Sequence, residues 1–282
     1  MTLKSNHLKK LKKAAKLGDA TAQFELAEHL WFKTDSKNNQ IAAGLYRAAA
    51  EQGHLEAQYT LANLFHVYPR EYIGEDESIE WFKKAAAHGH INSMFELGCC
   101  YSHGMYMDPV MEEAVKWFQL AADRGHAGAQ YELGIHYGKV KNHEKSIEWF
   151  KKAVAQKHTE ARYELALCYL RGEGGGPDAD KEAFKLLRLA GMRSHPCAQY
   201  VIGCLYSEGK VVWKNDRLAL KWWLKAAKRW HPDAQEQVRL SYVLGRGTKM
   251  DRAMADKWYK IISERDIPQA NPLKFMLPVK ID

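Results

Sequence analysis

The chain has 282 residues, of which 46% are hydrophobic and 27% charged, and its formal net charge of +8 gives a pI near 9.1. No apolar run approaches the roughly 20 residues that cross a bilayer, and no apolar segment follows the basic N-terminus, so we expect neither a membrane span nor export. Five cysteines form an odd set, which favours a reducing cytoplasm over a disulfide-bonded secreted fold.

Residues 1–18 are predicted to form a basic capping helix. They contain six lysines and no acidic residue, so they hold most of the excess charge and leave +2 for the remainder. Ala14, Ala15 and Gly18 stand where two small residues and a glycine end several of the later second helices, and Lys10 stands where most of those helices carry a tryptophan. Half a repeat with a polar residue in place of its large apolar one is typical of the end of a repeat array.

A motif recurs seven times after this segment. A small residue anchors each copy, at spacings of 32 to 37 residues, and the anchors are Ala22, Ala57, Ser93, Ala129, Ala161, Ala198 and Ala234. A period in this range predicts an array of paired helices. Apolar residues four and eight positions after the anchor share one helical face, and the residue at position five is mostly Ala or Gly, which allows a neighbouring helix to approach.

A second helix is predicted after a loop in each repeat, with a large apolar residue about twenty to twenty-five positions past the anchor. Two small residues usually follow its large apolar residue, which is Leu45, Trp81, Trp117, Trp149, Leu186, Trp222 or Trp258. Large side chains beside small ones are typical of interlocked helices. Because a buried tryptophan removes roughly 150–250 Å² from water, we expect this column to dominate stability. Gly53, Gly89 and Gly125 are predicted to end second helices in the left-handed conformation.

The predicted repeats occupy residues 19–266. Their approximate ranges are 19–53, 54–89, 90–125, 126–157, 158–194, 195–230 and 231–266. Glu236 and Arg239 replace an aromatic and a small residue in the last repeat, which indicates a terminal cap. The Pro-containing tail, residues 267–282, is interpreted as an extended strip over the last helix pair, with a detachable linear motif as the alternative.

The recurring small residue, Leu-Gly, Tyr, Trp and Ala-Ala-x-x-Gly pattern resembles the Sel-one-like repeat (SLR) family. The match is clearest at Tyr131-Glu132-Leu133-Gly134 with Tyr137, and at Trp81-Phe82-Lys83-Lys84-Ala85-Ala86 with Gly89. Ser93 at an anchor and Leu186 at a tryptophan position depart from it. The resemblance implies an all-α, right-handed α/α superhelix related to tetratricopeptide repeats, a bacterial origin, and an adaptor or scaffold role.

Histidine recurs three residues before six of the anchors, at His54, His90, His126, His158, His195 and His231, and Asp19 takes this position in the first repeat. Helices pack about 8–10 Å apart, so histidines of successive repeats are too distant to share one metal ion. A helix-start or inter-repeat hydrogen-bonding role is favoured. Cys99 and His103 lie on one helical face, but no second cluster has zinc-site spacing. We predict no metal and no cofactor.

Catalytic and nucleic-acid motifs are absent. The sequence has neither a G-x-S-x-G elbow nor a phosphate-binding G-x-x-x-x-G-K-[ST] loop, and the glycine run at 172–176 follows a helix and contains Glu173. A carboxylate recurs three positions after four anchors, once per repeat, which favours solvated or inter-repeat contacts: Glu25, Glu96, Glu132 and Glu164. Because these catalytic motifs are missing, we expect no catalytic residue. No Lys/Arg stripe with stacking aromatics is visible in the sequence, so we expect no nucleic-acid partner.

The first helices are expected to line the concave groove, as the resemblance implies. Positions six, nine and ten after the anchor lie outside the set of apolar positions that pack between helices. The residues at these positions vary from repeat to repeat, which is typical of a recognition surface. The candidate partner-binding residues are Trp31, Asn63, His66, His103, Lys139, Arg171 and Glu208, with the aromatic column Tyr59, Phe95, Tyr131, Tyr163 and Tyr200. For the tyrosines, inter-repeat packing is the favoured interpretation and groove binding the alternative, and for Trp31 packing against the N-terminal cap stands on an equal footing with binding.

The leading functional hypothesis is a cytoplasmic, non-catalytic scaffold that binds a peptide or folded protein in its groove. One specific form, implied by the resemblance, is an immunity protein that occludes a toxin. The alternatives are a hydrolase of the kind proposed for cysteine-rich relatives, and a binder of nucleic acid or an acidic surface through Lys4–Lys16. The sequence does not indicate the oligomeric state.

Overall fold

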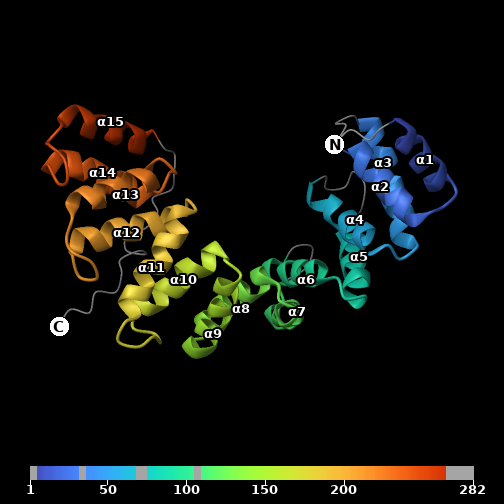
Figure 1. The fold of residues 1–282 in the computed structure, drawn as a ribbon, viewed down its shortest axis with the longest axis horizontal. Helices are drawn as coiled ribbons and strands as arrows, with labels where there is room; N and C mark the ends of the chain where they lie inside the picture. The colour runs from blue at the N-terminus through green and yellow to red at the C-terminus, as the bar shows by residue number, and fades with distance from the viewer. Residues whose placement is uncertain (1–4, 32–35, 68–74, 105–108, 265–282) are drawn as a thin grey trace. The chain divides into compact units, whose positions relative to one another are not determined.

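The computed structural model describes residues 5–31, 36–67, 75–104 and 109–264, and the predicted tail at 267–282 lies outside them (Figure 1). The described residues form fifteen α-helices and no strand. In chain order these are α1 (Ser5–Lys16), α2 (Ala20–Trp31), α3 (Ser36–Glu51), α4 (Leu55–Val67), α5 (Glu75–Ala87), α6 (Ile91–His103), α7 (Met111–Asp123), α8 (Ala127–Lys139), α9 (His143–Ala155), α10 (Thr159–Leu170), α11 (Ala179–Met192), α12 (Pro196–Glu208), α13 (Asp216–Ala227), α14 (Pro232–Leu244) and α15 (Arg252–Ser263).

The all-α helical repeat fold predicted from the sequence is confirmed. The chain divides into an N-terminal unit, residues 1–130, and a C-terminal unit, residues 131–282, with the division inside α8. Helices α1 to α7 pack each against the next within the N-terminal unit, and α9 to α15 do so within the C-terminal unit. None of the helices described is both long and apolar enough to cross a membrane.

The first helix of each repeat begins at the recurring histidine. The Nδ1 atom of His158 accepts a hydrogen bond from the backbone N–H of Ala161 at 3.2 Å, and five other histidines do the same for their anchors. Asp19 makes the equivalent bond to Ala22 through Oδ1 at 2.7 Å. Each cap satisfies a backbone donor that has no partner inside the helix, so the helix-start interpretation is confirmed.

The same histidine rings also join successive repeats. Each ring packs on the aromatic side chain two positions after the preceding anchor, with ring centroids 4.4–5.0 Å apart. The pairs are Phe24–His54, Tyr59–His90, Phe95–His126, Tyr131–His158, Tyr163–His195 and Tyr200–His231. One residue per repeat therefore both starts a helix and attaches that helix to the repeat before it.

A buried glutamine makes a second bond between repeats that the sequence analysis missed. The residue after the anchor is glutamine in five repeats, and its Nε2 donates to a backbone carbonyl at the end of the preceding second helix. Gln199, for example, reaches the Gly191 carbonyl at 2.8 Å. Each of these carbonyls also accepts a backbone N–H from the turn that follows its helix, so the glutamine adds a second hydrogen bond to the helix end from a neighbouring repeat. The five are Gln23, Gln58, Gln130, Gln199 and Gln235.

The closest helix packing involves the residue after the tryptophan position. A Cβ added to Gly134 in α8 would lie 2.5 Å from Cδ1 of Phe150 in α9, and the same overlap occurs between Gly98 and Phe118 and between Gly203 and Trp223. The small residue at position five is therefore needed because an aromatic ring of the following helix lies directly against its backbone.

The tryptophan column lies beside this contact and closer to solvent. Trp81, Trp149 and Trp258 are buried, whereas Trp117 and Trp222 are half-buried. A lysine ammonium covers the rings of Trp81, Trp149 and Trp222 at 3.8–4.2 Å from the ring centroid. The expectation that this column dominates stability stays a prediction, since the following column makes the tighter contact.

The predicted left-handed ends of the second helices are confirmed at Gly53, Gly89 and Gly125, with φ of 87–88°. Later repeats place residues with a Cβ in the same position. Lys157 has φ 66°, Ser194 70° and Trp230 66°. L-residues pay about 1–2 kcal/mol for this conformation, so these three helix ends are strained where the earlier ones are not.

Replacing Lys157 with glycine is therefore expected to stabilise the C-terminal unit. The side chain is exposed, and glycine relieves the left-handed strain, worth about 1 kcal/mol after its greater entropy in the unfolded chain is subtracted. Thermal unfolding should show a midpoint raised by a few degrees. Lys151→Gly, inside α9, is the control and should lower the midpoint, because glycine weakens a helix interior.

Candidate functional site

The surface of the first helices on the side away from their anchors is the candidate site, although Val201 at one of its positions is buried. Positions one before the anchor and three, six and ten after it fall within 60° of one another at about 100° per residue. We call these positions on α2, α4, α6, α8, α10, α12 and α14 the first-helix face. The anchor and the residues four and eight positions after it lie on the other side of each helix, where the anchors are buried.

The predicted partner-binding residues are divided between the two units. Trp31, Tyr59, Asn63, Phe95 and His103 lie in the N-terminal unit. The side chain of His66 lies outside the described residues. The C-terminal unit holds the others, which are Tyr131, Lys139, Tyr163, Arg171, Tyr200 and Glu208.

The most exposed of these residues stand at position ten, near the ends of first helices: His103, Lys139, Arg171 and Glu208. The His103 ring lies 3.0 Å from the carbonyl oxygen of Cys99, one turn back in the same helix. Asn63 is half-buried, and its Nδ2 donates to the carbonyl of Tyr59 at 3.1 Å. Lys139 and Glu208 are thus the candidates that project farthest from local packing.

Arg171 is held within its own loop. Its guanidinium donates to both carboxylate oxygens of Glu173 at 2.9 and 3.0 Å, and the same carboxylate lies 3.2 Å from Nδ1 of His143. Burial raises the pKa of Glu173, but the bond and charge of Arg171 outweigh it and leave that pKa below its usual value. Arg171 therefore orders the turn into α11 and has less freedom to bind a partner than Lys139.

The aromatic candidates are all half-buried and lie against the histidine rings described above. Trp31 makes an edge contact with Tyr46 of α3, with centroids 6.2 Å apart. Their role in binding stays a prediction, because each ring presents one part to its neighbour and another to the surface.

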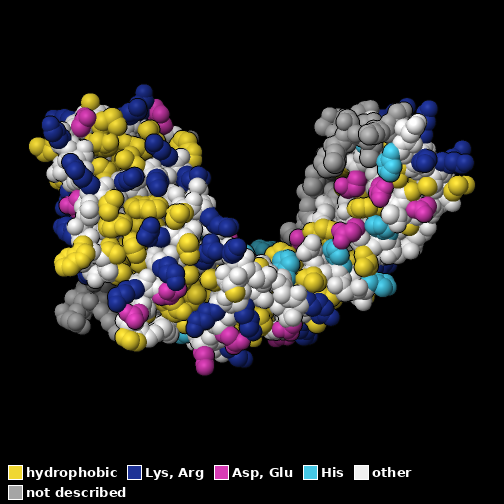
Figure 2. Space-filling model, viewed as in Figure 1, with side chains coloured by type: hydrophobic (Ala, Val, Ile, Leu, Met, Phe, Trp, Pro, Cys, Tyr) yellow, Lys and Arg dark blue, Asp and Glu magenta, His cyan; other side chains and the backbone are white. Residues whose placement is uncertain are grey.

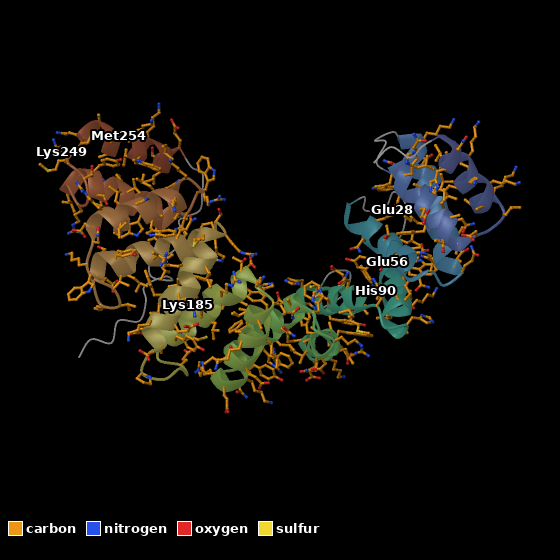
Figure 3. The ribbon with its side chains drawn as sticks, in the orientation of Figure 1. Glu28, Glu56, His90, Lys185, Lys249 and Met254 are labelled. Atoms are coloured by element: carbon orange, nitrogen blue, oxygen red, sulfur yellow. The ribbon has the colours of Figure 1, made fainter. Side chains whose placement is uncertain are left out.

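Carboxylates dominate the first-helix face. In the N-terminal unit it carries Glu25, Glu28, Glu56 and Glu96, and among the described residues of that part there is no lysine or arginine. Figure 2 shows acidic side chains on the visible side of this unit, and Figure 3 labels Glu28, Glu56 and His90 there. The Glu56 carboxylate lies 3.4 Å from Nε2 of His90.

The C-terminal unit continues the same pattern. Its part of the face carries five carboxylates and two cations, and one of those cations, Arg171, is bound to Glu173. The carboxylates are Glu132, Glu160, Glu164, Glu208 and Asp233. Glu164 in this unit and Glu96 in the other are half-buried, and this burial raises the pKa of both carboxyl groups.

The described cysteines are buried or half-buried free thiols. Burial raises the pKa of Cys100 and of Cys168 to about 12, and that of Cys204 to about 11. Thiols with such values stay protonated near neutral pH and are poor nucleophiles. No group of three metal-ligating side chains comes together anywhere in the described ranges.

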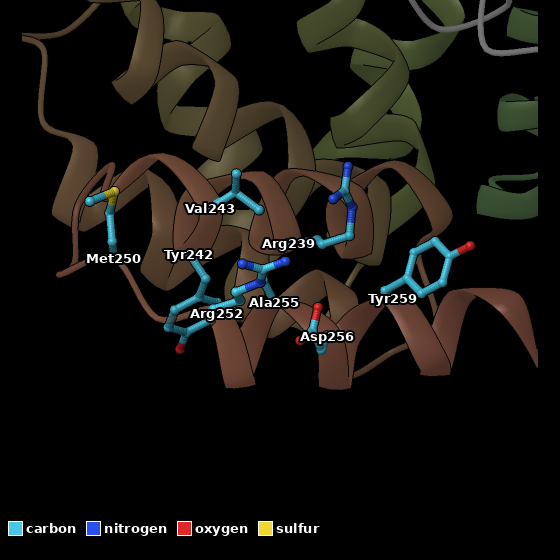
Figure 4. A pocket seen from close by; sticks show the side chains of 8 residues that line it. All are labelled: Arg239, Tyr242, Val243, Met250, Arg252, Ala255, Asp256 and Tyr259. Carbon is cyan, nitrogen blue, oxygen red and sulfur yellow. The ribbon is translucent and has the colours of Figure 1, made fainter.

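The seventh helix pair has an open cavity of about 730 Å³ between α14 and α15 (Figure 4). Arg239 occupies the small-residue position there and is paired with Glu236, so the ring of Tyr259 cannot enter and stays 62% exposed. Asp256 is exposed where the preceding repeat buries Leu220. The cavity lining is Arg239, Tyr242, Val243, Met250, Arg252, Ala255, Asp256 and Tyr259.

Comparison with protein families finds one described as the Sel1 repeat. Its model matches six consecutive segments, and the predicted seventh repeat at 231–266 is not among them. The matched residues are 20–54, 55–90, 91–126, 127–158, 159–195 and 198–229.

Two solved structures are similar over 92% of this chain, each at 27% identity. One is a protective antigen of uropathogenic Escherichia coli with an SLR fold, with a TM-score of 0.82 over 56% of the antigen. The other is a Sel1 repeat protein from Oxalobacter formigenes, with a TM-score of 0.65 over 87% of that chain. The DAP3-binding cell death enhancer 1 of Rattus norvegicus is 38% identical over 66 residues, which are 23% of this chain and 13% of that protein. The chain therefore spans little more than half of the antigen and a small part of the rat protein.

Proposed function

The chain belongs to the Sel1 repeat family, and we propose that it is a non-catalytic scaffold that holds a protein partner against its first-helix face. The family generally provides protein-interaction scaffolds, and its fold here leaves part of the first-helix face exposed, at positions one before the anchor and ten after it. The raised pKa values of the buried thiols support a role without nucleophilic catalysis.

The charge of the first-helix face carries the proposal further. Four carboxylates without a lysine or arginine on the N-terminal part attract a cationic segment and repel an acidic one. We assign the partner a Lys/Arg-rich peptide or a basic surface of a folded protein. A few anchors would supply most of the affinity, and the half-buried aromatic rings are the candidates for them.

The proposed setting is the cytoplasm, in keeping with the free cysteines. An immunity role is one specific form of the same function. In that form the partner is a toxin whose basic surface is covered by the first-helix face.

Charge reversal on the two faces tests this proposal. Glu25→Lys combined with Glu56→Lys changes two exposed carboxylates of the first-helix face. Glu80→Lys combined with Glu112→Lys makes the same change of charge on the second helices α5 and α7, where both residues are exposed. Tagged wild type and the α5/α7 variant should recover the same stoichiometric protein from native lysate, and the first-helix variant should recover at least ten-fold less. Equal recovery by both variants, or no stoichiometric protein with wild type, contradicts the proposal.

A further inference from the structure

The outer side of the second helices in the C-terminal unit has a charge opposite to that of the first-helix face. On α11, α13 and α15 and the residues that follow their C-terminal ends, the exposed side chains include twelve cations and four carboxylates, Asp180, Glu182, Asp256 and Glu264. The cations are Lys181, Lys185, Arg188, Arg193, Arg217, Lys221, Lys225, Lys228, Arg229, Arg252, Lys257 and Lys260. We call this surface the basic outer face.

This face is a local feature of the chain. Residues 179–264 contain 17 Lys/Arg and 9 Asp/Glu, whereas residues 18–178 contain 16 and 23. The +2 that remains outside the N-terminal cap is therefore the small difference between a strongly basic and a strongly acidic stretch. The equivalent positions on α9 mix Glu144 and Glu148 with three lysines, so the excess begins at α11.

The three helices form one continuous surface. A Cβ added to Gly191 of α11 would lie 3.2 Å from the indole of Trp222 in α13. Trp258 of α15 belongs to the same buried cluster as Trp223 of α13. Within the described residues, no carboxylate lies at salt-bridge distance from Arg188, Lys221 or Lys257.

Exposed apolar side chains lie among these cations. Leu189 is 40% exposed, Met192 69% and Trp230 63%. Leu189 and Met192, together with Phe184, Lys185 and Arg188, line a shallow hollow of about 290 Å³ on α11. Figure 2 shows Lys and Arg side chains interspersed with hydrophobic ones over the C-terminal unit, and Figure 3 labels Lys185 there.

We infer that the basic outer face docks on an anionic lipid surface. Each Lys or Arg close to an anionic leaflet contributes about 1 kcal/mol, and the long side chains can keep their charges among headgroups while their stems cover apolar area. Leu189, Met192 and Trp230 would enter the boundary between headgroups and acyl chains. Nucleic acid fits less well, because Leu189 and Met192 neither stack on bases nor bind phosphate, and Trp230 is the one aromatic ring among these three residues.

This role goes beyond the proposed function and is separable from it. The first-helix face lies on the other helix of each pair, so a partner held there does not need the cations of α11, α13 and α15. Docking on lipid would place the scaffold and its partner at an anionic membrane through the surface of its folded helices.

Vesicle sedimentation tests the inference with the full chain. The protein should sediment with vesicles of phosphatidylcholine and phosphatidylglycerol but not with phosphatidylcholine alone, and added salt should weaken binding. The variant Arg188→Glu/Lys221→Glu/Lys257→Glu should bind at least ten-fold more weakly. The control Lys83→Glu/Lys116→Glu/Lys151→Glu makes the same change of charge on α5, α7 and α9 and should bind more than the α11/α13/α15 variant.

Met192→Ser provides a second, milder variant at an exposed position, and it should weaken vesicle binding several-fold while partner capture is unchanged. Circular dichroism confirms that each variant keeps its helix content. No sedimentation of wild type with anionic vesicles overturns the inference, as does equal loss of binding in the control triple variant. Binding to a DNA duplex but not to vesicles, abolished by the α11/α13/α15 variant, would assign the face to nucleic acid and equally overturn it.

Discussion

Replacing Gly134 with alanine should destabilise the C-terminal unit by about 1–3 kcal/mol, although it adds only one methyl group to a residue type that favours helices. The added Cβ would lie 2.5 Å from Cδ1 and from Cε1 of Phe150, which is 3% exposed and held by packing on its other sides. Either the ring leaves its position or α8 and α9 move apart, and both lose close contacts.

A double-mutant cycle shows whether this contact is the cause. Phe150→Ala alone should cost about 3–5 kcal/mol because it leaves a cavity. In the Phe150→Ala background, Gly134→Ala should cost nothing or stabilise, because the ring that it meets is gone. The cost of the double variant should therefore fall short of the sum of the single costs by at least 1 kcal/mol.

Gly44 provides the matched control for the cycle. It lies inside α3, and a Cβ added there meets no atom within 4 Å. Gly44→Ala should stabilise by up to about 1 kcal/mol through helix propensity alone. Urea unfolding followed by circular dichroism measures all four variants, and additive costs at Gly134 and Phe150 would show that the two residues do not form the predicted contact.

Stability should fall as the pH is lowered from 7 to 5, and the capping histidines of the C-terminal unit should cause much of the loss. Burial lowers the pKa of His158, His195 and His231, which the nearby carboxylates Glu160 and Asp233 offset only in part. Each neutral Nδ1 accepts a backbone hydrogen bond, and protonation would remove that acceptor.

The direction of this change of stability with pH follows from proton binding. A histidine whose pKa is lower in the folded chain binds protons more readily when the chain is unfolded, at a pKa of about 6.5. Its stabilisation is complete above that pH and is lost as the pH falls through 6.5 toward the folded value. Each unit by which the folded chain lowers a histidine pKa contributes about 1.4 kcal/mol to the free energy of unfolding. The three histidines lose this contribution over the same range of pH.

Asparagine at the three caps separates this contribution from other titrations. Asparagine also caps helices, so His158→Asn/His195→Asn/His231→Asn should lose the ring contacts at pH 7 yet show a smaller change in urea midpoint between pH 7 and 5. Glu96 and Glu164, whose pKa values are raised, act in the opposite direction in both proteins. His88→Asn, outside the caps, is the control and should keep the slope of wild type. An unchanged slope in the triple variant would show that the caps are not the acid-sensitive groups.

The sequence was sufficient to predict the helical pairs, because the apolar residues and the left-handed glycines repeat at fixed positions. It also predicted the capping histidines, since Asp19 occupies the same position and aspartate is a common helix cap. The Gln199 type of bond was missed because a glutamine next to an anchor has no local partner, and its carbonyl acceptor lies eight residues back across a turn.

The contact of Gly134 with Phe150 was missed for a different reason. Trp149 is the larger and more regular residue, and only the rotation of α9 about its axis determines which of the two rings meets Gly134. The negative charge of the first-helix face was likewise not predicted from the sequence. Glu25, Glu28 and Glu56 stand at unequal spacings, and they form one surface only when the packed side of each helix is known.

Photo-cross-linking from single positions tests the central claim, that the partner lies on the first helices, most directly. A photoreactive amino acid replaces His103, Lys139 or Glu208 at exposed ends of first helices, and Lys116 or Lys151 at exposed positions on second helices. Irradiation in native lysate should give a covalent adduct of one defined mass from the first-helix positions and none from the second-helix positions. Adducts of that mass from Lys116 and Lys151 alone would contradict the account.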